Sequence, residues 1–360
     1  MYLPAKIIDY LIVGQGLAGT LIGFRLERAG HHVTYADAPE QQAASEVAAG
    51  IVNPITGRRF VKSWRIDELI PAARALYREL EEELDCRLWY DMPLVRTLFN
   101  RGDQNDWLAR SGDPGYADFL DDDPDLGRIP ALTHPAFAYA GVRHSARVDV
   151  GTLVLRYRER IRSTDRLLAT SPDYGALRVS PDGVALTDGT TTRSFDRVVF
   201  CEGWRARFNP WFGHLPYGGN KGEVLIVRLE GAPPLERLFK HRIFLVPQSD
   251  GTYWVGATSQ NRWEDESASP AGREYLEGRL RELLTVPFTV VEARAAVRPT
   301  IRDRRPVIGA HPEHPALWIF NGLGTKGASL APLVSEWLLR SLERGEVPPT
   351  EVGIGRFLVP

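Results

Sequence analysis

The feature that most constrains this chain is a glycine-rich turn near its N-terminus. Residues 7–13 form a short apolar segment that predicts a strand, and residues 17–29 carry apolar side chains at helical spacing. Between them lies the run Gly14-Gln15-Gly16-Leu17-Ala18-Gly19, and a second apolar strand is predicted at 33–36. A strand, glycine turn, helix and strand in this order predict a Rossmann-like nucleotide-binding fold.

Each position of the turn has a physical reason. Gly14 permits the tight turn, Gly16 lets the backbone approach a pyrophosphate, and Gly19 allows the helix to pack closely on the strand. The first amides of the helix, at Leu17 and Ala18, would face the phosphate charge. Asp37, followed by Ala38, ends the second strand, where a carboxylate can accept hydrogen bonds from ribose hydroxyls.

Composition narrows the class of protein. A chain of 360 residues is long enough for two domains, and its net charge of −2 disfavours an extended nucleic-acid surface. No segment approaches 18 apolar residues, so we expect no membrane span. The two cysteines, Cys86 and Cys201, cannot form a disulfide framework, which favours a reducing, cytoplasmic location. The eight histidines show no ligand spacing, and we predict no metal site.

The order of patterns along the chain predicts an α/β protein whose nucleotide domain is discontinuous. Helices are expected at 67–83, after Asp149, at 270–284 and at 326–342, while 89–141 has the character of strands and loops. We assign 1–88, 142–214 and 295–360 to a Rossmann-like nucleotide-binding domain. The segments 89–141 and 215–294 are assigned to an α+β, mixed-sheet substrate domain. Strands are expected at 198–201, within 222–260 and at 288–297.

Two further segments carry chemistry. Residues 44–54 place small side chains where a backbone must run against something flat or charged. Near the C-terminus, Arg298-Pro299 is followed by Asn321-Gly322-Leu323-Gly324-Thr325-Lys326-Gly327, which opens the last predicted helix. Glycine-exposed amides at a helix N-terminus stabilise negative charge. Together with the first turn, they indicate one extended cofactor held at both ends by distant parts of the chain.

With these motifs the chain resembles the D-amino-acid-oxidase superfamily of flavoenzymes, closest to its glycine oxidase and sarcosine oxidase branch. The matching segments span nearly the whole chain in the order of the family. Besides the N-terminal turn with Asp37, they are Ser45–Gly50, Val148-Asp149, Val199–Trp204, Lys221–Val224, Val246-Pro247, Val255–Thr258 and the C-terminal block.

The resemblance implies FAD in a two-domain fold, with the substrate between the flavin and a mixed sheet. Neither cysteine lies where the sarcosine oxidase branch links its flavin, so we expect non-covalent FAD. The residues implied at the cofactor are Gly14, Gly16, Leu17, Ala18, Gly19, Asp37, Ala38, Ser45, Ala49, Gly50, Ile51, Val52, Gly203, Trp204, Asn321, Gly322, Leu323, Gly324, Thr325, Lys326 and Gly327.

The resemblance also implies two catalytic positions. Arg298 corresponds to the arginine that grips the substrate carboxylate, a task suited to a planar bidentate donor. Lys326 begins the final helix, whose N-terminus is expected near the charge of the reduced flavin; the Lys326 side chain contacts the flavin directly or faces the pocket or solvent. Phe244 stands where the glycine oxidase pattern has a substrate-facing tyrosine, which puts glycine itself in doubt. Tyr217 and Tyr253 are further candidates for the substrate pocket, or for core packing.

The implied reaction is oxidation of a C–N bond in a small amine or amino acid, such as glycine, sarcosine or a D-amino acid. Hydride transfer to flavin N5 would give an imine that water hydrolyses, with dioxygen or another acceptor taking the electrons. The C-terminal region also resembles the flavin domain of the bifunctional tRNA wobble-uridine modification enzyme, so oxidation of a carboxymethylaminomethyl group on tRNA is the alternative. A flavin-binding scaffold without turnover and an NAD-dependent dehydrogenase also stay open.

Overall fold

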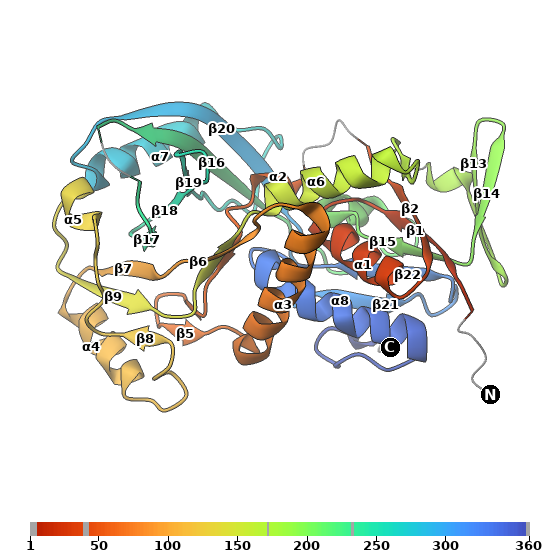
Figure 1. The fold of residues 1–360 in the computed structure, drawn as a ribbon, viewed down its shortest axis with the longest axis horizontal. Coiled ribbons are helices and arrows are strands. Elements are labelled where there is room, and N and C mark those ends of the chain that lie inside the picture. The colour runs from red at the N-terminus through yellow and green to blue at the C-terminus, as the bar shows by residue number, and fades with distance from the viewer. Residues whose placement is uncertain (1–5, 39–42, 171–172, 232–233, 358–360) are drawn as a thin grey trace.

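Two large β-sheets lie beside each other in the computed structural model, which describes residues 6–38, 43–170, 173–231 and 234–357 (Figure 1). The first sheet has the strand order β11-β2-β1-β15-β22-β21. Its first five strands run parallel and β21 is antiparallel. The bounds are β1 (Asp9–Val13), β2 (His32–Ala36), β11 (Leu167–Leu168), β15 (Arg197–Phe200), β21 (Val307–Ala310) and β22 (Leu317–Asn321).

Helices cover this parallel sheet, and its central strands are apolar and buried. Helix α1 (Leu17–Arg28) packs against α8 (Gly327–Arg344), which also contacts α3 (Ile66–Leu84). Helix α6 (Val150–Ser163) lies against α1 and starts at Asp149, whose side chain accepts a hydrogen bond from the Thr152 amide. A small antiparallel sheet extends from this half of the molecule, formed by β12 (Leu177–Ser180), β13 (Gly183–Asp188) and β14 (Thr191–Phe195).

The second sheet has the order β20-β16-β19-β18-β17-β7-β9-β8 and is antiparallel except where β17 and β7 pair. Helix α7 (Pro270–Leu283) packs on one face over a core that includes Leu225, Val255 and Leu276. The strands are β7 (Leu94–Leu98), β8 (Leu120–Asp121), β9 (Ala138–Val142), β16 (Asn220–Leu229), β17 (Leu238–Lys240), β18 (Phe244–Pro247), β19 (Tyr253–Gly256) and β20 (Phe288–Arg298).

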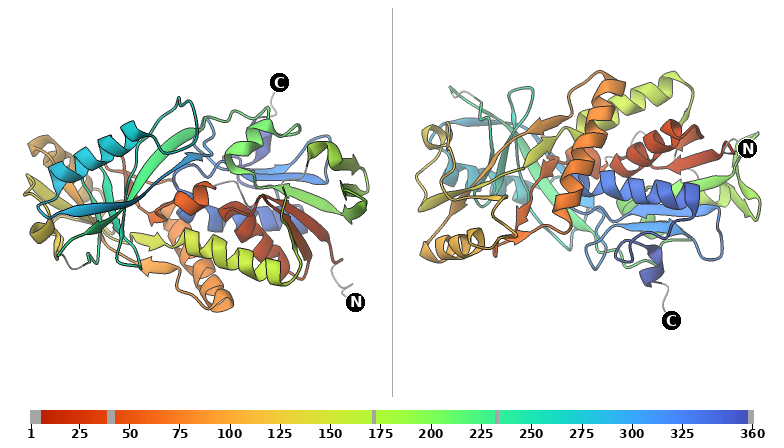
Figure 2. Two further views of the ribbon diagram at one scale, coloured as in Figure 1. Left: turned by 90° about the horizontal axis from the view of Figure 1, so that it is seen from above. Right: turned by 60° about the horizontal axis from the view of Figure 1, so that its bottom comes forward.

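The chain passes between the two sheets several times, as the turned views show (Figure 2). The crossings include a three-stranded sheet of β3 (Ile51–Val52), β10 (Ala146–Val148) and β6 (Trp89–Asp91). The remaining short elements are α2 (Ala44–Val47), β4 (Ile55–Thr56), β5 (Val61–Lys62), α5 (Ile129–Leu132), η1 (Tyr174–Ala176), η2 (Gly203–Phe208) and η3 (Ile354–Phe357). Within the described residues, no helix is both long and apolar enough to cross a membrane.

The predicted α/β class, with a parallel nucleotide-type sheet and a mixed second sheet, is confirmed. One local expectation is wrong: 89–141 is not only strands and loops, because α4 spans Arg101–Ser111. This helix buries only Trp107 and therefore has almost no apolar periodicity. The sequence signal for this helix is its N-cap, where the Asn100 side chain accepts a hydrogen bond from the Asp103 amide at 2.9 Å. The assignment of chain segments to two domains stays a prediction.

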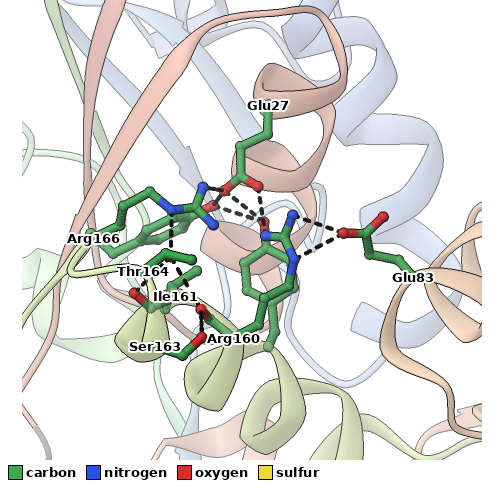
Figure 3. Close-up of polar contacts among 9 residues, drawn as sticks. Glu27, Glu83, Arg160, Ile161, Ser163, Thr164 and Arg166 are labelled. Carbon is green, nitrogen blue, oxygen red and sulfur yellow. Dashed lines mark hydrogen bonds and ion pairs between the residues drawn. The ribbon is translucent and has the colours of Figure 1, made fainter.

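A buried carboxylate joins the helical layer of the first sheet. Glu27 on α1 accepts hydrogen bonds from Arg160 on α6 (2.7 Å) and from the Tyr35 and Tyr157 hydroxyls (2.8 and 3.0 Å). Arg166 forms a further ion pair with it at 2.7 Å (Figure 3). Burial alone would raise the pKa of Glu27, but these donors outweigh it and hold the pKa below its ordinary value.

We expect Glu27→Gln to lower the free energy of unfolding by about 2–4 kcal/mol at pH 7, because it leaves two guanidinium groups without their shared carboxylate. A carboxyl with a depressed pKa stabilises the fold above its unfolded pKa of 4.5 and loses that effect on acidification. Urea unfolding should therefore show the gap between wild type and variant narrowing as the pH falls below about 4.5.

Glu83→Gln is the matched control. Among the described residues Glu83 accepts hydrogen bonds only from Arg160, and the side chains of Glu83 and Arg160 are both 29% exposed. Its effect should stay below about 1 kcal/mol. Equal losses in the two variants would contradict a special role for Glu27.

Candidate active site

A single cavity of about 700 Å³ runs between the two sheets and collects most of the predicted site residues. Its volume is in the range of sites for extended organic ligands. The predicted residues that line it are Gly14, Gly16, Leu17, Ala18, Asp37, Ser45, Ala49, Gly50, Ile51, Gly203, Trp204, Phe244, Arg298, Asn321, Leu323, Gly324, Thr325, Lys326 and Gly327.

The glycine turn at one end of the cavity is packed so closely that side chains do not fit. A Cβ on Gly14, where φ is +95°, would lie 2.5 Å from the Cys201 carbonyl oxygen. A Cβ on Gly19 would lie 1.9 Å from the Gly14 carbonyl oxygen, which explains why Gly19 supports the turn without lining the cavity. Gly16 is the N-cap of α1 and faces the cavity directly. The turn therefore presents bare backbone to a ligand.

Ser45 holds the start of α1. Its hydroxyl accepts the Leu17 amide at 2.9 Å, one of the helix donors that lack an intrahelical partner. A few residues on, Gly50 adopts φ +67°, and a Cβ there would lie 1.8 Å from the Val148 carbonyl oxygen. The Val148 amide donates to the Gly50 carbonyl at 2.9 Å. The small-residue stretch of the sequence is thus required where the backbone crosses β10.

Asp37 is held by neighbours that the sequence analysis did not identify. The Gln15 amide donates to one carboxylate oxygen at 3.0 Å, and Arg158 on α6 pairs with the other. Arg158 also donates to the Gln15 side-chain oxygen at 2.8 Å. Burial raises the pKa of Asp37, while these donors act in the opposite direction. Arg158 therefore positions the acid that is predicted to face a ribose.

Asn321 joins two distant chain segments in the wall of the cavity. Its side-chain amide donates to the Gly203 carbonyl at 2.8 Å, and its oxygen accepts the Gly322 amide at 2.7 Å. Gly322 lies behind the wall, where a Cβ would meet Ile301 at 2.7 Å. This arrangement connects the end of β22 to the end of β15.

Lys326 starts α8 and points its ammonium group toward polar side chains. The ammonium donates to the Ser63 hydroxyl at 3.0 Å and to the Thr56 hydroxyl at 3.3 Å. Burial lowers the pKa of Lys326, and the charge of Arg305 adds to this effect. No carboxylate in the described chain pairs with this ammonium, which lines the cavity as a free cation.

Arg298, at the end of β20, is the second free cation. Its guanidinium donates to the Asn220 side-chain oxygen at 2.6 Å and more weakly to the Thr258 carbonyl. A Cβ on Gly222 would lie 2.0 Å from the guanidinium, so this glycine makes room for it. Burial lowers the pKa of Arg298, and among the described residues no carboxylate compensates its charge. The group can therefore bind an anion in the cavity.

Other predicted residues lie elsewhere. Tyr253 belongs to the core between the second sheet and α7, where its hydroxyl accepts the Leu235 amide at 2.8 Å. Tyr217 packs in the core around β15, and its buried hydroxyl has no hydrogen-bond partner among the described residues. Ala38 and Val52 also do not line the cavity. For the two tyrosines the structure corrects the predicted place: they are packing residues.

Three further residues line the cavity. Trp254 donates its indole N–H to the Val47 carbonyl at 2.8 Å and so fixes β19 against α2. Lys240 lines the cavity beside Phe244. Glu202 follows β15 and lines the wall near the glycine turn. Glu202 lies in the Val199–Trp204 segment of the resemblance, whereas Lys240 and Trp254 lie in none of the matching segments and reach the cavity only through the register of the second sheet.

Glu202 is a buried acid beside the cavity. It accepts hydrogen bonds from the Tyr174 hydroxyl (2.7 Å) and the Asn209 amide (2.8 Å). Burial raises the pKa of Glu202 to about 7, although both donors favour the charged form. The neighbouring Cys201 is also buried, which raises its pKa and keeps the thiol a poor nucleophile. No group of three or more His, Cys, Asp or Glu side chains in the described chain is arranged to hold a metal ion.

Because the folded chain binds the Glu202 proton more tightly than the unfolded chain, stability should fall as the pH rises from about 4.5 to about 7. Glu202→Gln cannot titrate and should remove this component, which amounts to about 3 kcal/mol at most. Urea unfolding of wild type and variant at pH 5 and pH 8, at equal cofactor content, measures the difference. Identical pH slopes would show that Glu202 is charged throughout.

Comparison with known proteins agrees with this geometry. Residues 9–340 match the family model for DAO, the FAD dependent oxidoreductases. The chain is 28% identical over 357 residues to a glycine oxidase of Geobacillus kaustophilus, covering 94% of this chain and 93% of that protein. The crystal structure of glycine oxidase from Geobacillus kaustophilus shares the fold, with a TM-score of 0.80, 23% identity and 97% coverage of both chains.

A further relative is named for a different function. The tRNA 5-methylaminomethyl-2-thiouridine biosynthesis bifunctional protein of Thiobacillus denitrificans is 24% identical over 382 residues. The alignment covers 97% of this chain but only 58% of that protein.

Proposed function

Because the chain belongs to the DAO family of FAD-dependent oxidoreductases, we propose that it oxidises the C–N bond of a small amine or amino acid whose carboxylate binds Arg298. The observation that carries this proposal is the uncompensated Arg298 guanidinium in the wall of the cavity. A cation at such a site costs solvation energy unless an anion binds there. A substrate carboxylate supplies that anion with the planar geometry that a guanidinium prefers.

The residues present fit an FAD. The bare backbone at Gly14 and Gly16 suits a pyrophosphate, and the cavity continues from there to Lys326 and Arg298. We propose that Asp37, oriented by Arg158, receives the ribose hydroxyls. The amides at the start of α8 and the Lys326 ammonium would balance negative charge at the reactive ring. When bound, FAD supplies the two-electron acceptor for the C–H bond next to nitrogen.

The chain's own residues would then bind and orient the substrate. Arg298, held by Asn220 and the Thr258 carbonyl, places the carboxylate, and the apolar surfaces of Phe244 and Trp254 border the rest of the substrate. The substrate must arrive with a neutral amine, because Arg298, Lys326 and Lys240 place positive charge around it. Loss of a hydride from the carbon next to nitrogen would leave an iminium ion, and water would convert this ion to a carbonyl compound and a protonated amine.

A second candidate is oxidation of a carboxymethylaminomethyl group on tRNA wobble uridine, which the match to the bifunctional tRNA protein supports. That group is chemically an N-substituted glycine, so Arg298 would serve the same purpose. Salt-dependent tRNA binding, measured by gel shift from 50 to 200 mM salt, would favour this candidate. We also propose a reducing compartment, since Cys86 and Cys201 are both free.

We expect the purified protein to show the visible absorbance of oxidised flavin, released by acid because no covalent link is predicted. Under anaerobic conditions, a panel of glycine, sarcosine, longer N-alkyl glycines and D-amino acids should include at least one compound that bleaches it. Admitting dioxygen or a quinone then identifies the electron acceptor. A colourless protein after reconstitution with FAD would contradict the proposal.

Arg298→Ala should weaken binding of the reducing substrate by about 30-fold to 1,000-fold, because a charge-assisted bidentate contact is lost. Arg298→Lys should recover only part of the affinity, since an ammonium lacks the planar fork. Arg302→Ala removes an exposed arginine of the same segment and should change affinity less than about threefold. Unchanged carboxylate binding in Arg298→Ala would show that the site assignment is wrong.

A further inference from the structure

A second cationic site lies in the same cavity, on the floor formed by the second sheet. Val224, Gly256, Phe244 and Lys240 face each other in register across β16, β19, β18 and β17. All four line the cavity, because residues opposite each other on neighbouring strands share one face. The row continues into β7, where Arg96 is the register partner of Lys240.

Lys240 is half-buried without a carboxylate partner. Its ammonium donates to the Arg242 carbonyl at 3.0 Å and lies 4.3 Å from the centroid of the Phe244 ring. Burial lowers the pKa of Lys240 to about 8, and the charge of Arg96 contributes to the shift. Within the described chain, no acid neutralises this group.

Arg96 supports Lys240 from the adjacent strand and is also unpaired. Its Nε is buried without a hydrogen-bond partner, and its guanidinium lies 4.3 Å from the centroid of the Phe60 ring. Burial lowers the pKa of Arg96 to about 10, and Asp103 is the carboxylate whose charge opposes this shift. Asp103 forms no ion pair with Arg96 in the described structure. Two cationic side chains therefore occupy paired positions on adjacent strands, and neither has a carboxylate partner among the described residues.

Elsewhere the same chain neutralises its most buried cations. Lys221, whose side chain is 4% exposed, pairs with Glu223 at 3.4 Å. Arg147, 3% exposed, pairs with Asp149 at 2.8 Å. Unpaired buried cations are costly, and adjacent ones repel each other. Lys240 and Arg96 differ from these pairs, because two cations occupy paired positions of one sheet beside the cavity and neither has a carboxylate partner among the described residues. This arrangement indicates a site for an external anion, by the same reasoning that applies to Arg298.

We propose that Lys240, supported by Arg96, binds a second anionic group of the substrate, so that the substrate class is an amine with a carboxylate at each end or a carboxylate and a phosphoryl group. This inference rests on the proposed function, in which Arg298 takes the carboxylate next to the reacting nitrogen. Arg298 on β20 and Lys240 on β17 are four strands apart, which separates their backbones by about 19 Å across the sheet. Along the strand direction the two positions are separated by about 13 Å. A substrate that reaches both must be longer than glycine.

The floor between the two cations is apolar. Phe244 and Trp254 line the cavity between Lys240 and the β20 edge of the sheet. Methylene groups would pack there, while the two charged ends reach Arg298 and Lys240. The phenylalanine that departs from the glycine oxidase pattern is thus consistent with a substrate that carries an alkyl linker. N-(carboxyalkyl)glycines have this chemistry.

The test compares three probes on the FAD-loaded enzyme: N-(3-carboxypropyl)glycine, its neutral terminal amide, and N-(3-phosphonopropyl)glycine. Binding is read from the change in the flavin spectrum under anaerobic conditions, and reduction from its bleaching. We expect wild type to bind at least one dianion about 10- to 100-fold more tightly than the amide. Which dianion binds more tightly distinguishes a carboxylate site from a phosphoryl site.

Lys240→Met should abolish this preference and leave the affinity for the amide within about threefold, whereas Lys240→Arg should retain it. Arg96→Met should reduce it partly, because Arg96 acts through Lys240. Arg242→Met is the matched control, since it removes an exposed cation two residues away and keeps the backbone carbonyl. The melting temperature of Lys240→Met should not fall below that of wild type, because the substitution removes a cation that Arg96 repels. An unchanged melting temperature separates a binding effect from misfolding.

Equal binding of the dianions and the amide by wild type would overturn the inference, while bleaching by the amide would leave the proposed function standing. Slower reoxidation of Lys240→Met without a change in selectivity would also overturn it. Conversely, Lys240-dependent binding of a dianion without bleaching by any amine would keep the second anion site and refute the proposed oxidation.

Discussion

The close approach of bare backbone at a few glycines is the constraint on which this structure depends. At Gly14, Gly19 and Gly50 an added Cβ would meet a carbonyl oxygen within 2.5 Å. The Gly14 contact holds the end of β1 against the end of β15, and the Gly50 contact holds the small-residue stretch against the end of β10. Any side chain there would push the strand ends apart and destroy the surface that receives the cofactor. The fold and the cofactor site therefore rest on the same contacts.

The pairing of charged side chains differs between the helical layer of the first sheet and the cavity. Around the helices of the first sheet, buried acids and bases neutralise each other, as Glu27 does with Arg160 and Arg166. In the cavity the balance is different, because Arg298, Lys326 and Lys240 have no carboxylate partner among the described residues. Under the proposed function, anionic ligands would offset the electrostatic cost of these cations. A cavity of this kind favours a substrate that brings negative charge with it, and it favours a neutral amine between the cations.

Much of the cofactor end could be predicted because its residues are contiguous in the sequence. The run from Gly14 to Gly19, the stretch at Gly50 and the glycines after Asn321 each combine a backbone requirement with a fixed spacing. The substrate end was predicted less well. Tyr253 is an aromatic residue in a strand of the right region, but strand alternation turns it toward α7 and away from the cavity. The α4 helix was missed because it buries a single tryptophan.

By itself, the sequence determined the glycine-rich turn and the α/β class, because each depends on local spacing or periodicity, and it predicted a cationic anchor at Arg298 from one motif. Only the tertiary structure decided that Arg158 holds Asp37, that Glu202 is a buried acid, and that Lys240 stands beside Arg96 on the cavity floor. These pairs come from segments far apart in the chain. Strand register decides which of these side chains are neighbours, and burial shifts their pKa values. Neither effect can be predicted from residues adjacent in the sequence.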